Sequence, residues 1–225
     1  YEETLEKINN SKSSITIAQK EEEEKVNKLK EWLTENKVSA GVNIDEDSKR
    51  YYPYSTLASQ VIGACGTDNQ GLSGIEYSYD SILKGTSGEV VMSTDASKSE
   101  IPNSQESFIP AENGYNLTLT IDINIQSIVE KYLKEAVEEN ACSKGGNCII
   151  MDPKTGNILA MASYPNYDLN SPFTPTSYYA DNWDSLSNEE KNSRIYNMWH
   201  VRSVFETYEP GSVFKLITAS WGKYY

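Results

Sequence analysis

The segment Tyr208-Glu209-Pro210-Gly211-Ser212-Val213-Phe214-Lys215-Leu216-Ile217-Thr218-Ala219 joins a Pro-Gly pair to an apolar run. Proline and glycine interrupt the preceding structure, and the apolar run predicts a helix that begins near Ser212. Residues three apart share a helix face, so the Lys215 amine can reach the Ser212 hydroxyl. This arrangement suits acyl transfer, in which a lysine shielded from water takes the proton of a serine nucleophile.

The same serine-lysine spacing occurs at two further places, Ser81/Lys84 and Ser220/Lys223. The first pair lies late in a predicted short helix just before Gly85, and the second is interrupted by Gly222. Neither context presents the serine at a helix start. We therefore interpret Ser212 as a nucleophile and Lys215 as its general base. The alternative is that Ser212 only caps a helix and Lys215 is a surface charge.

Composition limits the kinds of partner. The 225 residues are 38% hydrophobic, which is enough to build a core. Thirty-three acidic against 20 basic side chains give a net charge of -13, which repels polyanions and argues against nucleic-acid binding. No stretch approaches the roughly 20 apolar residues that span a bilayer, and residues 1–10 lack the features of a signal peptide.

The first half of the chain predicts few long elements. Residues 20–37 predict one helix with an apolar stripe, and the acidic run at 21–24 is a solvated face favoured by the helix N-terminus. Short strands are predicted at 42–44 and 89–93, and glycines separate two short helices between them. Residues 95–112 are polar and contain Pro102 and Pro110, which predicts a domain boundary near residue 110.

The second half is more regular. Residues 116–121 alternate as a strand, and Asp122 or Asn124 can cap a helix that follows. The stripe of that helix is Ile125, Ile128, Val129, Tyr132, Leu133, Ala136 and Val137. Strands at 148–152 and 157–163 are joined by the turn Pro153-Lys154-Thr155-Gly156, and 164–196 is predicted to be a long irregular stretch. A strand followed by an amphipathic helix predicts the entry to an α/β or α+β domain, and α+β is the fold class that we expect.

The cysteines leave several interpretations open. An odd count of three, Cys65, Cys142 and Cys148, guarantees at least one unpaired thiol within the chain. Cys142 and Cys148 could form a disulfide, or share a zinc site with His200 and an Asp. Because Cys148 opens an apolar strand, we favour a plain buried thiol and predict no metal and no cofactor.

The segment Glu209-Pro210-Gly211-Ser212-Val213-Phe214-Lys215 resembles the active-site signature of penicillin-binding proteins. Further blocks follow in that family's order: Arg50-Tyr51-Tyr52-Pro53, Gly71-Leu72-Ser73-Gly74-Ile75-Glu76, Asn113-Gly114-Tyr115-Asn116-Leu117, Thr120-Ile121-Asp122, Gln126, and Asp152-Pro153-Lys154-Thr155-Gly156-Asn157-Ile158-Leu159-Ala160-Met161-Ala162. The chain is similar to class B, in which a non-catalytic pedestal precedes the transpeptidase domain. We therefore expect a pedestal (dimerisation-type) domain at 1–110 and the N-terminal part of a transpeptidase domain at 111–225.

The resemblance implies a peptidoglycan D,D-transpeptidase whose domain fold is an antiparallel sheet flanked by helices. Ser212 would attack stem peptides ending in D-Ala-D-Ala, with Lys215 as base, and β-lactams would acylate Ser212. Implied partners are a membrane glycosyltransferase and proteins of division, elongation or sporulation. The implied location is the extracytoplasmic face of the bacterial membrane, with an N-terminal anchor helix that this chain lacks.

The chain departs from the family's pattern in its catalytic motifs and in its last residues, Trp221-Gly222-Lys223-Tyr224-Tyr225. The family has S-x-N and K-T-G motifs after the nucleophile, whereas here S-x-N is absent and the K-T-G at 154–156 precedes Ser212. We therefore read Lys154 as a turn residue and expect the 225 residues alone to be inactive. Two alternative functions are a non-catalytic scaffold module and a β-lactam sensor or β-lactamase, although the motifs at 50–53 and 71–76 argue against the latter.

Overall fold

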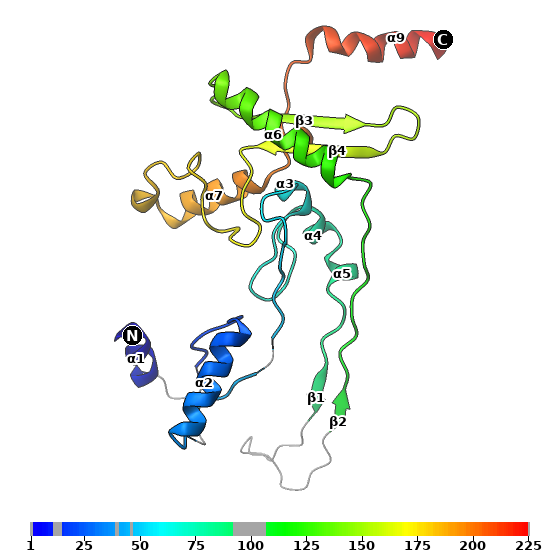
Figure 1. The fold of residues 1–225 in the computed structure, drawn as a ribbon. Coiled ribbons are helices and arrows are strands. Elements are labelled where there is room, and N and C mark those ends of the chain that lie inside the picture. Colours follow the sequence, from blue (N-terminus) through cyan, green and yellow to red (C-terminus); the bar gives the residue numbers. More distant parts are fainter. Residues whose placement is uncertain (1, 11–14, 39–40, 46, 92–106, 225) are drawn as a thin grey trace. The chain divides into compact units, whose positions relative to one another are not determined.

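The computed structural model describes residues 2–10, 15–38, 41–45, 47–91 and 107–224. The described chain contains both helices and strands, and the strands occur in two consecutive pairs (Figure 1). Their bounds are α1 Glu2–Asn10, α2 Glu23–Glu35, α3 Ser59–Ile62, α4 Gly74–Ser78, α5 Asp80–Leu83, β1 Glu89–Val91, β2 Ser107–Ile109, α6 Ile123–Glu139, β3 Gly146–Met151, β4 Ile158–Tyr164, η1 Trp183–Ser185, α7 Asn188–Trp199, α8 Arg202–Phe205, η2 Gly211–Phe214 and α9 Lys215–Tyr224. The mixture confirms the predicted α+β class. None of the described helices has the length and apolarity needed to cross a bilayer.

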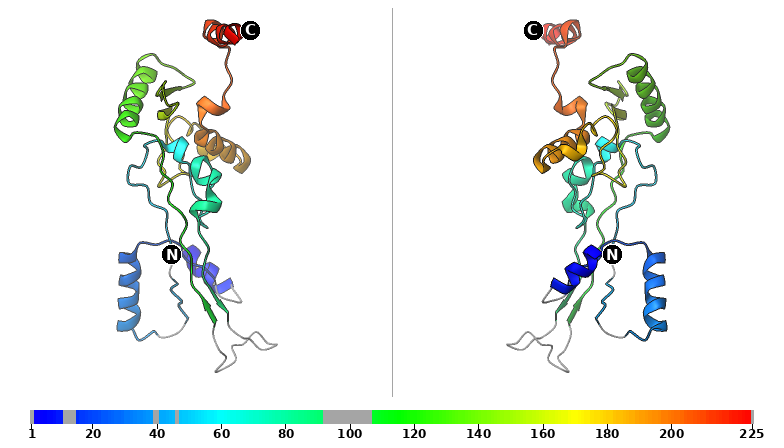
Figure 2. Two further views of the ribbon diagram at one scale, coloured as in Figure 1. Left: turned by 90° about the vertical axis from the view of Figure 1, so that its right-hand side faces the viewer. Right: turned by 90° about the vertical axis from the view of Figure 1, so that its left-hand side faces the viewer.

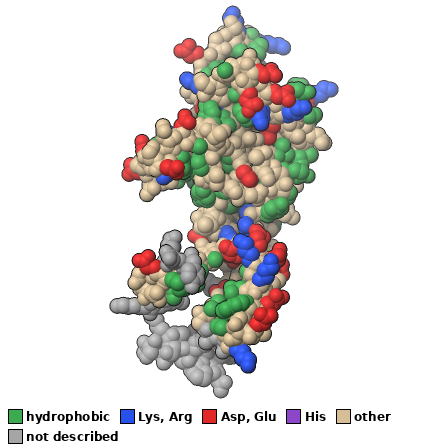
Figure 3. Space-filling view, turned by 60° about the vertical axis from the view of Figure 1, so that its left-hand side comes forward, with side chains coloured by type: hydrophobic (Ala, Val, Ile, Leu, Met, Phe, Trp, Pro, Cys, Tyr) green, Lys and Arg blue, Asp and Glu red, His purple; other side chains and the backbone are tan. Residues whose placement is uncertain are grey.

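The chain divides into two compact units, Tyr1–Tyr51 and Tyr52–Tyr225. In the first, α2 confirms the helix predicted at 20–37, and the acidic run at 21–24 lies exposed, as predicted. Lys25 and Lys28 pair with glutamates one turn earlier, at 2.8 and 2.6 Å. Leu29 and Trp32 of α2 are exposed as well, and Figure 3 shows hydrophobic side chains on the surface among charged ones. The strand predicted at 42–44 is wrong, because no described segment pairs with it and alternation alone does not supply a partner edge.

The second unit is built around an apolar core of Tyr52, Ala64, Tyr167, Leu169, Ile195, Met198 and Trp199. Burying a large side chain contributes roughly 1.5–3 kcal/mol each. The Asn170 side chain accepts from Tyr52 N at 3.0 Å and donates to Tyr52 O at 2.9 Å. The Tyr52 hydroxyl donates to the Glu76 carboxylate at 3.2 Å. Residues of two sequence blocks, at 50–53 and 71–76, thus meet in one core.

An antiparallel hairpin of β3 and β4 supports α6, as both views of Figure 2 show. The tight turn at 153–156 joins the strands as predicted, with Gly156 at φ 77° and the Asp152 carboxylate accepting from Lys154 N at 2.9 Å. Lys154 is therefore a turn residue. Hydrogen bonds to the Asp152 carboxylate lower its pKa from the usual value. The bond from Lys154 N has the largest effect, and the bond from the Thr155 hydroxyl has the next largest.

Helix α6 begins where the sequence predicted. The Asp122 carboxylate accepts from the backbone of Asn124 and Ile125 at 2.9 and 3.0 Å, which satisfies two free N–H groups of the first turn. The strand predicted at 116–121 is wrong. Thr120 and Asp122 reach the edge of β4 at Ile158 O and Leu159 O, but residues 116–119 join no ladder.

Two further expectations need correction or remain open. Within the stretch predicted as irregular, 164–196, the structure places most of α7, which starts with a capping box between Ser187 and Glu190. The strand predicted at 89–93 is confirmed as β1 and pairs with β2, while residues 92 and 93 lie outside the described residues. The domain boundary near residue 110 stays a prediction.

Candidate active site

Ser212 lies in the 3-10 turn η2, which runs directly into α9. Gly211 before it has φ 54°, a backbone conformation that favours glycine, and the Pro210 carbonyl accepts from Val213 N at 3.2 Å. Lys215 is the first residue of α9. The Pro-Gly pair therefore places Ser212 at a helix start, and Lys215 lies one turn further along the helix.

This helix start is open to solvent. Ser212 and Lys215 are exposed, and no hydrogen bond in the described chain joins their side chains. Neighbouring apolar side chains are exposed as well: Val213 62%, Phe214 52%, Leu216 74%, Ile217 60% and Trp221 68%. A lysine becomes a base where its surroundings disfavour the charged form, and the described residues provide no such shielding around α9. The roles of Ser212 and Lys215 remain predictions.

The segment that leads to Ser212 is anchored at Arg202 in α8. This side chain is nearly buried, with 9% of the residue exposed, and its guanidinium donates to Lys144 O and, at 3.1 Å, to the Tyr179 hydroxyl. Glu206 approaches it at 3.3 Å. Burial opposes the positive charge, but the bond with Tyr179 and the nearby Glu206 raise the pKa of Arg202 above its usual value.

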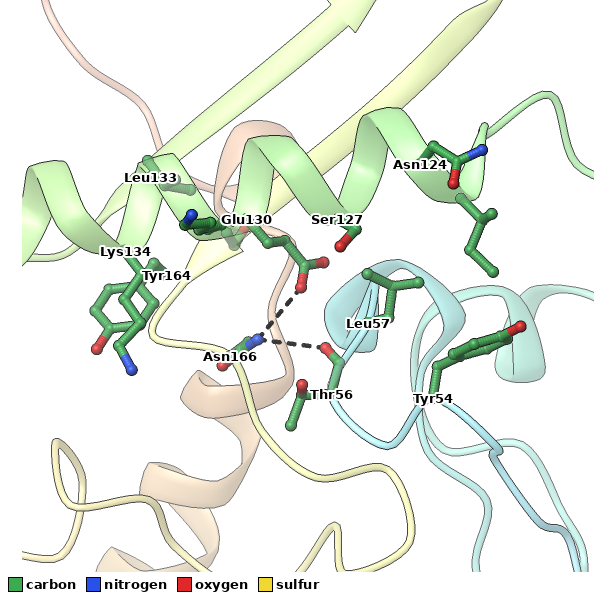
Figure 4. A pocket seen from close by; sticks show the side chains of 13 residues that line it. Tyr54, Thr56, Leu57, Asn124, Ser127, Glu130, Leu133, Lys134, Tyr164 and Asn166 are labelled. Carbon is green, nitrogen blue, oxygen red and sulfur yellow. Dashed lines mark hydrogen bonds between the residues drawn. The ribbon is translucent and has the colours of Figure 1, made fainter.

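A second polar cluster lies beneath α6 in an open cavity of about 530 Å³ (Figure 4). The Glu130 carboxylate there accepts from Ala58 N and from Gln126 Nε2, both at 2.7 Å, and more weakly from Asn166 at 3.5 Å. Gln126 is fully buried and bonds both N and O of Met161 in β4, at 2.8 and 3.0 Å. Burial raises the pKa of Glu130, although these three donors oppose the rise.

The sequence named Gln126 as part of the resemblance, but the bonds that it and Glu130 make were not predicted. The predicted stripe of α6 placed Ile128 and Tyr132 on the buried face, but they are 57% and 60% exposed. The packed face carries Gln126, which bonds β4, and Glu130, which bonds Ala58 and Asn166, together with Val137 of the predicted stripe. No periodicity signals these bonds, because the partners at residues 58, 161 and 166 are distant in the sequence.

The raised pKa of Glu130 predicts a pH-dependent stability difference. In the folded state the Glu130 carboxyl keeps its proton at pH values above its usual pKa of 4.5. The stability that this protonated carboxyl contributes is therefore fully present below pH 4.5 and is lost as pH rises through the folded pKa. Glu130→Gln keeps an oxygen acceptor and removes the titration. We expect it to gain stability relative to the wild type between pH 4.5 and 7, with a net change at neutral pH within about 1 kcal/mol. Urea unfolding across that range measures it.

The matched control is Glu135→Gln, which changes an exposed carboxylate of the same helix. Because this carboxylate is exposed, the Glu135→Gln variant provides the reference curve of stability against pH. If the Glu130→Gln variant follows the same curve, burial does not govern the Glu130 carboxyl.

The residues considered for zinc do not gather into a site. None of Cys65, Cys142 and Cys148 forms a disulfide, and Cys142 is exposed while Cys148 is half-buried in β3. His200 is exposed and stacks on Phe205, with ring centroids 4.9 Å apart. Among the residues that the structure describes, no three His, Cys, Asp or Glu side chains group as metal ligands.

Comparison with known proteins identifies the family. Residues 1–119 match the penicillin-binding protein dimerisation domain, and residues 146–223 match the penicillin-binding protein transpeptidase domain. The chain belongs to the penicillin-binding proteins, and the order of these two domains makes it a member of class B. The resemblance read from residues 50–219 is therefore confirmed.

Individual relatives agree. The stage V sporulation protein D of Bacillus subtilis is 38% identical over 79% of this chain and 25% of its own length. The peptidoglycan D,D-transpeptidase FtsI of Buchnera aphidicola is 43% identical over 58% of this chain and 22% of its own. A crystal structure of a peptidoglycan synthetase from Bifidobacterium adolescentis matches with a TM-score of 0.56 and 30% identity, covering 76% of this chain and 27% of that one. The chain thus spans about a quarter of the length of these relatives.

Proposed function

We propose that this chain is part of a peptidoglycan D,D-transpeptidase and that Ser212 is its nucleophile. The observation that carries the proposal is the position of Ser212 in a Pro-Gly turn at the start of α9, one turn before Lys215, within the stretch that matches the transpeptidase domain. Relatives named as D,D-transpeptidases support the same reaction.

The proposed chemistry has two acyl transfers. The Ser212 oxygen attacks the penultimate D-alanine carbonyl, and the hydroxyl proton passes to the Lys215 amine and then to the nitrogen of the departing D-alanine. An ester on Ser212 results. An amine of a second stem peptide attacks this ester, forms the cross-link and returns the proton to Ser212. A β-lactam carbonyl enters at the first step and leaves Ser212 acylated.

The reaction draws on no cofactor in this proposal, since a serine and a lysine suffice for the proton transfers. Cys142, Cys148 and His200 would then be ordinary side chains, and purified protein is expected to contain well under one zinc per chain by elemental analysis. The proposed location is the outer face of the bacterial membrane. Proposed partners are a membrane glycosyltransferase and proteins of division, elongation or sporulation, in keeping with a relative named for sporulation.

The direct test is release of D-alanine. The complete protein is incubated with a peptide ending in D-Ala-D-Ala, and free D-alanine is measured with and without prior exposure to benzylpenicillin. We expect release that penicillin blocks. An intact protein that binds cell-wall partners but neither releases D-alanine nor is acylated would favour the scaffold function. Rapid hydrolysis of the penicillin itself would favour a β-lactamase.

A further inference from the structure

Arg202 is the last firmly buried side chain before the nucleophile. It is 9% exposed, whereas Val204 and Phe205 are each 66% exposed and Tyr208 is 77% exposed. Of the described residues between Arg202 and Ser212, none is buried. The position of Arg202 therefore fixes where the chain leaves the packed unit on its way to α9.

Three acceptors from different places hold the guanidinium. Lys144 O comes from the turn that leads into β3, the Tyr179 hydroxyl comes from the long segment after β4, and Glu206 lies one helical turn ahead. The Tyr179 hydroxyl in turn donates to Asn197 O of α7 at 3.4 Å. A planar guanidinium reaches several acceptors at fixed angles, which a lysine amine on its flexible stem does not.

Arg194 provides a close comparison within the same region. Its guanidinium donates to Tyr179 O at 3.0 Å and to Asp181 O at 2.5 Å, so it also holds the segment around residue 179. It lies on α7, however, and not on the segment that leads to Ser212. Replacing each arginine in turn therefore distinguishes two effects: loss of order in the segment around residue 179, and loss of the anchor for the segment that leads to Ser212.

We propose that Arg202 is a positioning residue that fixes the segment bearing Ser212 against the start of β3. This inference rests on the proposed function, because a fixed exit point matters for acylation only if Ser212 is the nucleophile. A displacement of about 1 Å at a reacting group can cost about 100-fold in rate. Loss of Arg202 should therefore slow acylation while leaving initial binding of a β-lactam nearly unchanged.

The test uses the complete protein and benzylpenicillin, with the acylation rate constant separated from the dissociation constant of the initial complex. We expect Arg202→Met to lower the rate constant about 10–100-fold, with Arg202→Lys in between and the dissociation constant within about threefold. Arg194→Met should stay within about threefold of the wild type in both quantities. Equal losses from Arg202→Met and Arg194→Met, or a wild-type rate in Arg202→Met, would overturn the proposal.

A second measurement does not depend on activity. Amide hydrogen exchange in the absence of any ligand should speed up over residues 203–211 in Arg202→Met and in Arg202→Lys, but not in Arg194→Met. Unchanged exchange there would also overturn the proposal. If exchange responds as expected but the wild type is never acylated at Ser212, the proposed function fails and the anchoring by Arg202 stands.

Discussion

Replacing Ser212 with alanine in the complete protein is expected to abolish covalent labelling by a fluorescent penicillin, a fall of at least about 10³-fold. The hydroxyl oxygen forms the ester, so no neighbouring group replaces it. The melting temperature should change by at most a few degrees, because Ser212 is exposed and its side chain has no bonding partner among the described residues. Gel fluorescence and a thermal melt measure the two effects.

Ser220→Ala is the matched control for this experiment. Ser220 lies on α9, which follows η2 directly. It also precedes a lysine by three residues, and its hydroxyl donates to Ile217 O at 2.9 Å. Labelling should be unaffected by its loss. Persistent labelling of Ser212→Ala at the wild-type rate would show that another residue is the nucleophile.

The 225 residues expressed alone are expected not to be labelled at a specific site. General base catalysis contributes about 10²–10⁴-fold, and oriented donors for the oxyanion contribute about as much or more. In the described chain no other element covers Ser212 or Lys215, so neither the shielding of the lysine nor a set of donors facing the serine is present. We expect labelling at least about 10³-fold slower than in the complete protein.

Heat-denatured protein sets the background for that comparison, and intact mass spectrometry detects any adduct. Circular dichroism must first show that the isolated chain is folded. Specific acylation of Ser212 at a rate close to that of the complete protein would show that η2 and α9 suffice for catalysis.

Local signals in the sequence predicted the local structure well. Asp122, one of two predicted caps, marks the start of α6, and Pro153-Lys154-Thr155-Gly156 predicted the hairpin turn, because both signals depend on neighbouring residues only. The capping box at Ser187 and Glu190 was equally local, and it should have indicated α7. The strands predicted at 42–44 and 116–121 depended on a partner edge, which alternation within the strand does not reveal.

The contacts that hold the second unit together were not predictable in this way. Tyr52 bonds with Asn170, Glu130 with Ala58 and Arg202 with Lys144, and each pair is separated by more than 50 residues. The position of Ser212 at a helix start was predictable because proline and glycine precede it directly. Its surroundings were not, because they depend on which elements pack against α9.

The most direct test of the central claim is to locate the adduct. The complete protein is acylated with benzylpenicillin and digested with trypsin, which cleaves after Arg202 and Lys215 and so releases residues 203–215 as one peptide. Fragmentation then distinguishes Ser212 from Ser203 and Thr207. The account predicts a stoichiometric penicilloyl group on Ser212. An adduct on a different residue would contradict it. So would a protein whose activity benzylpenicillin inhibits while Ser212 stays unmodified.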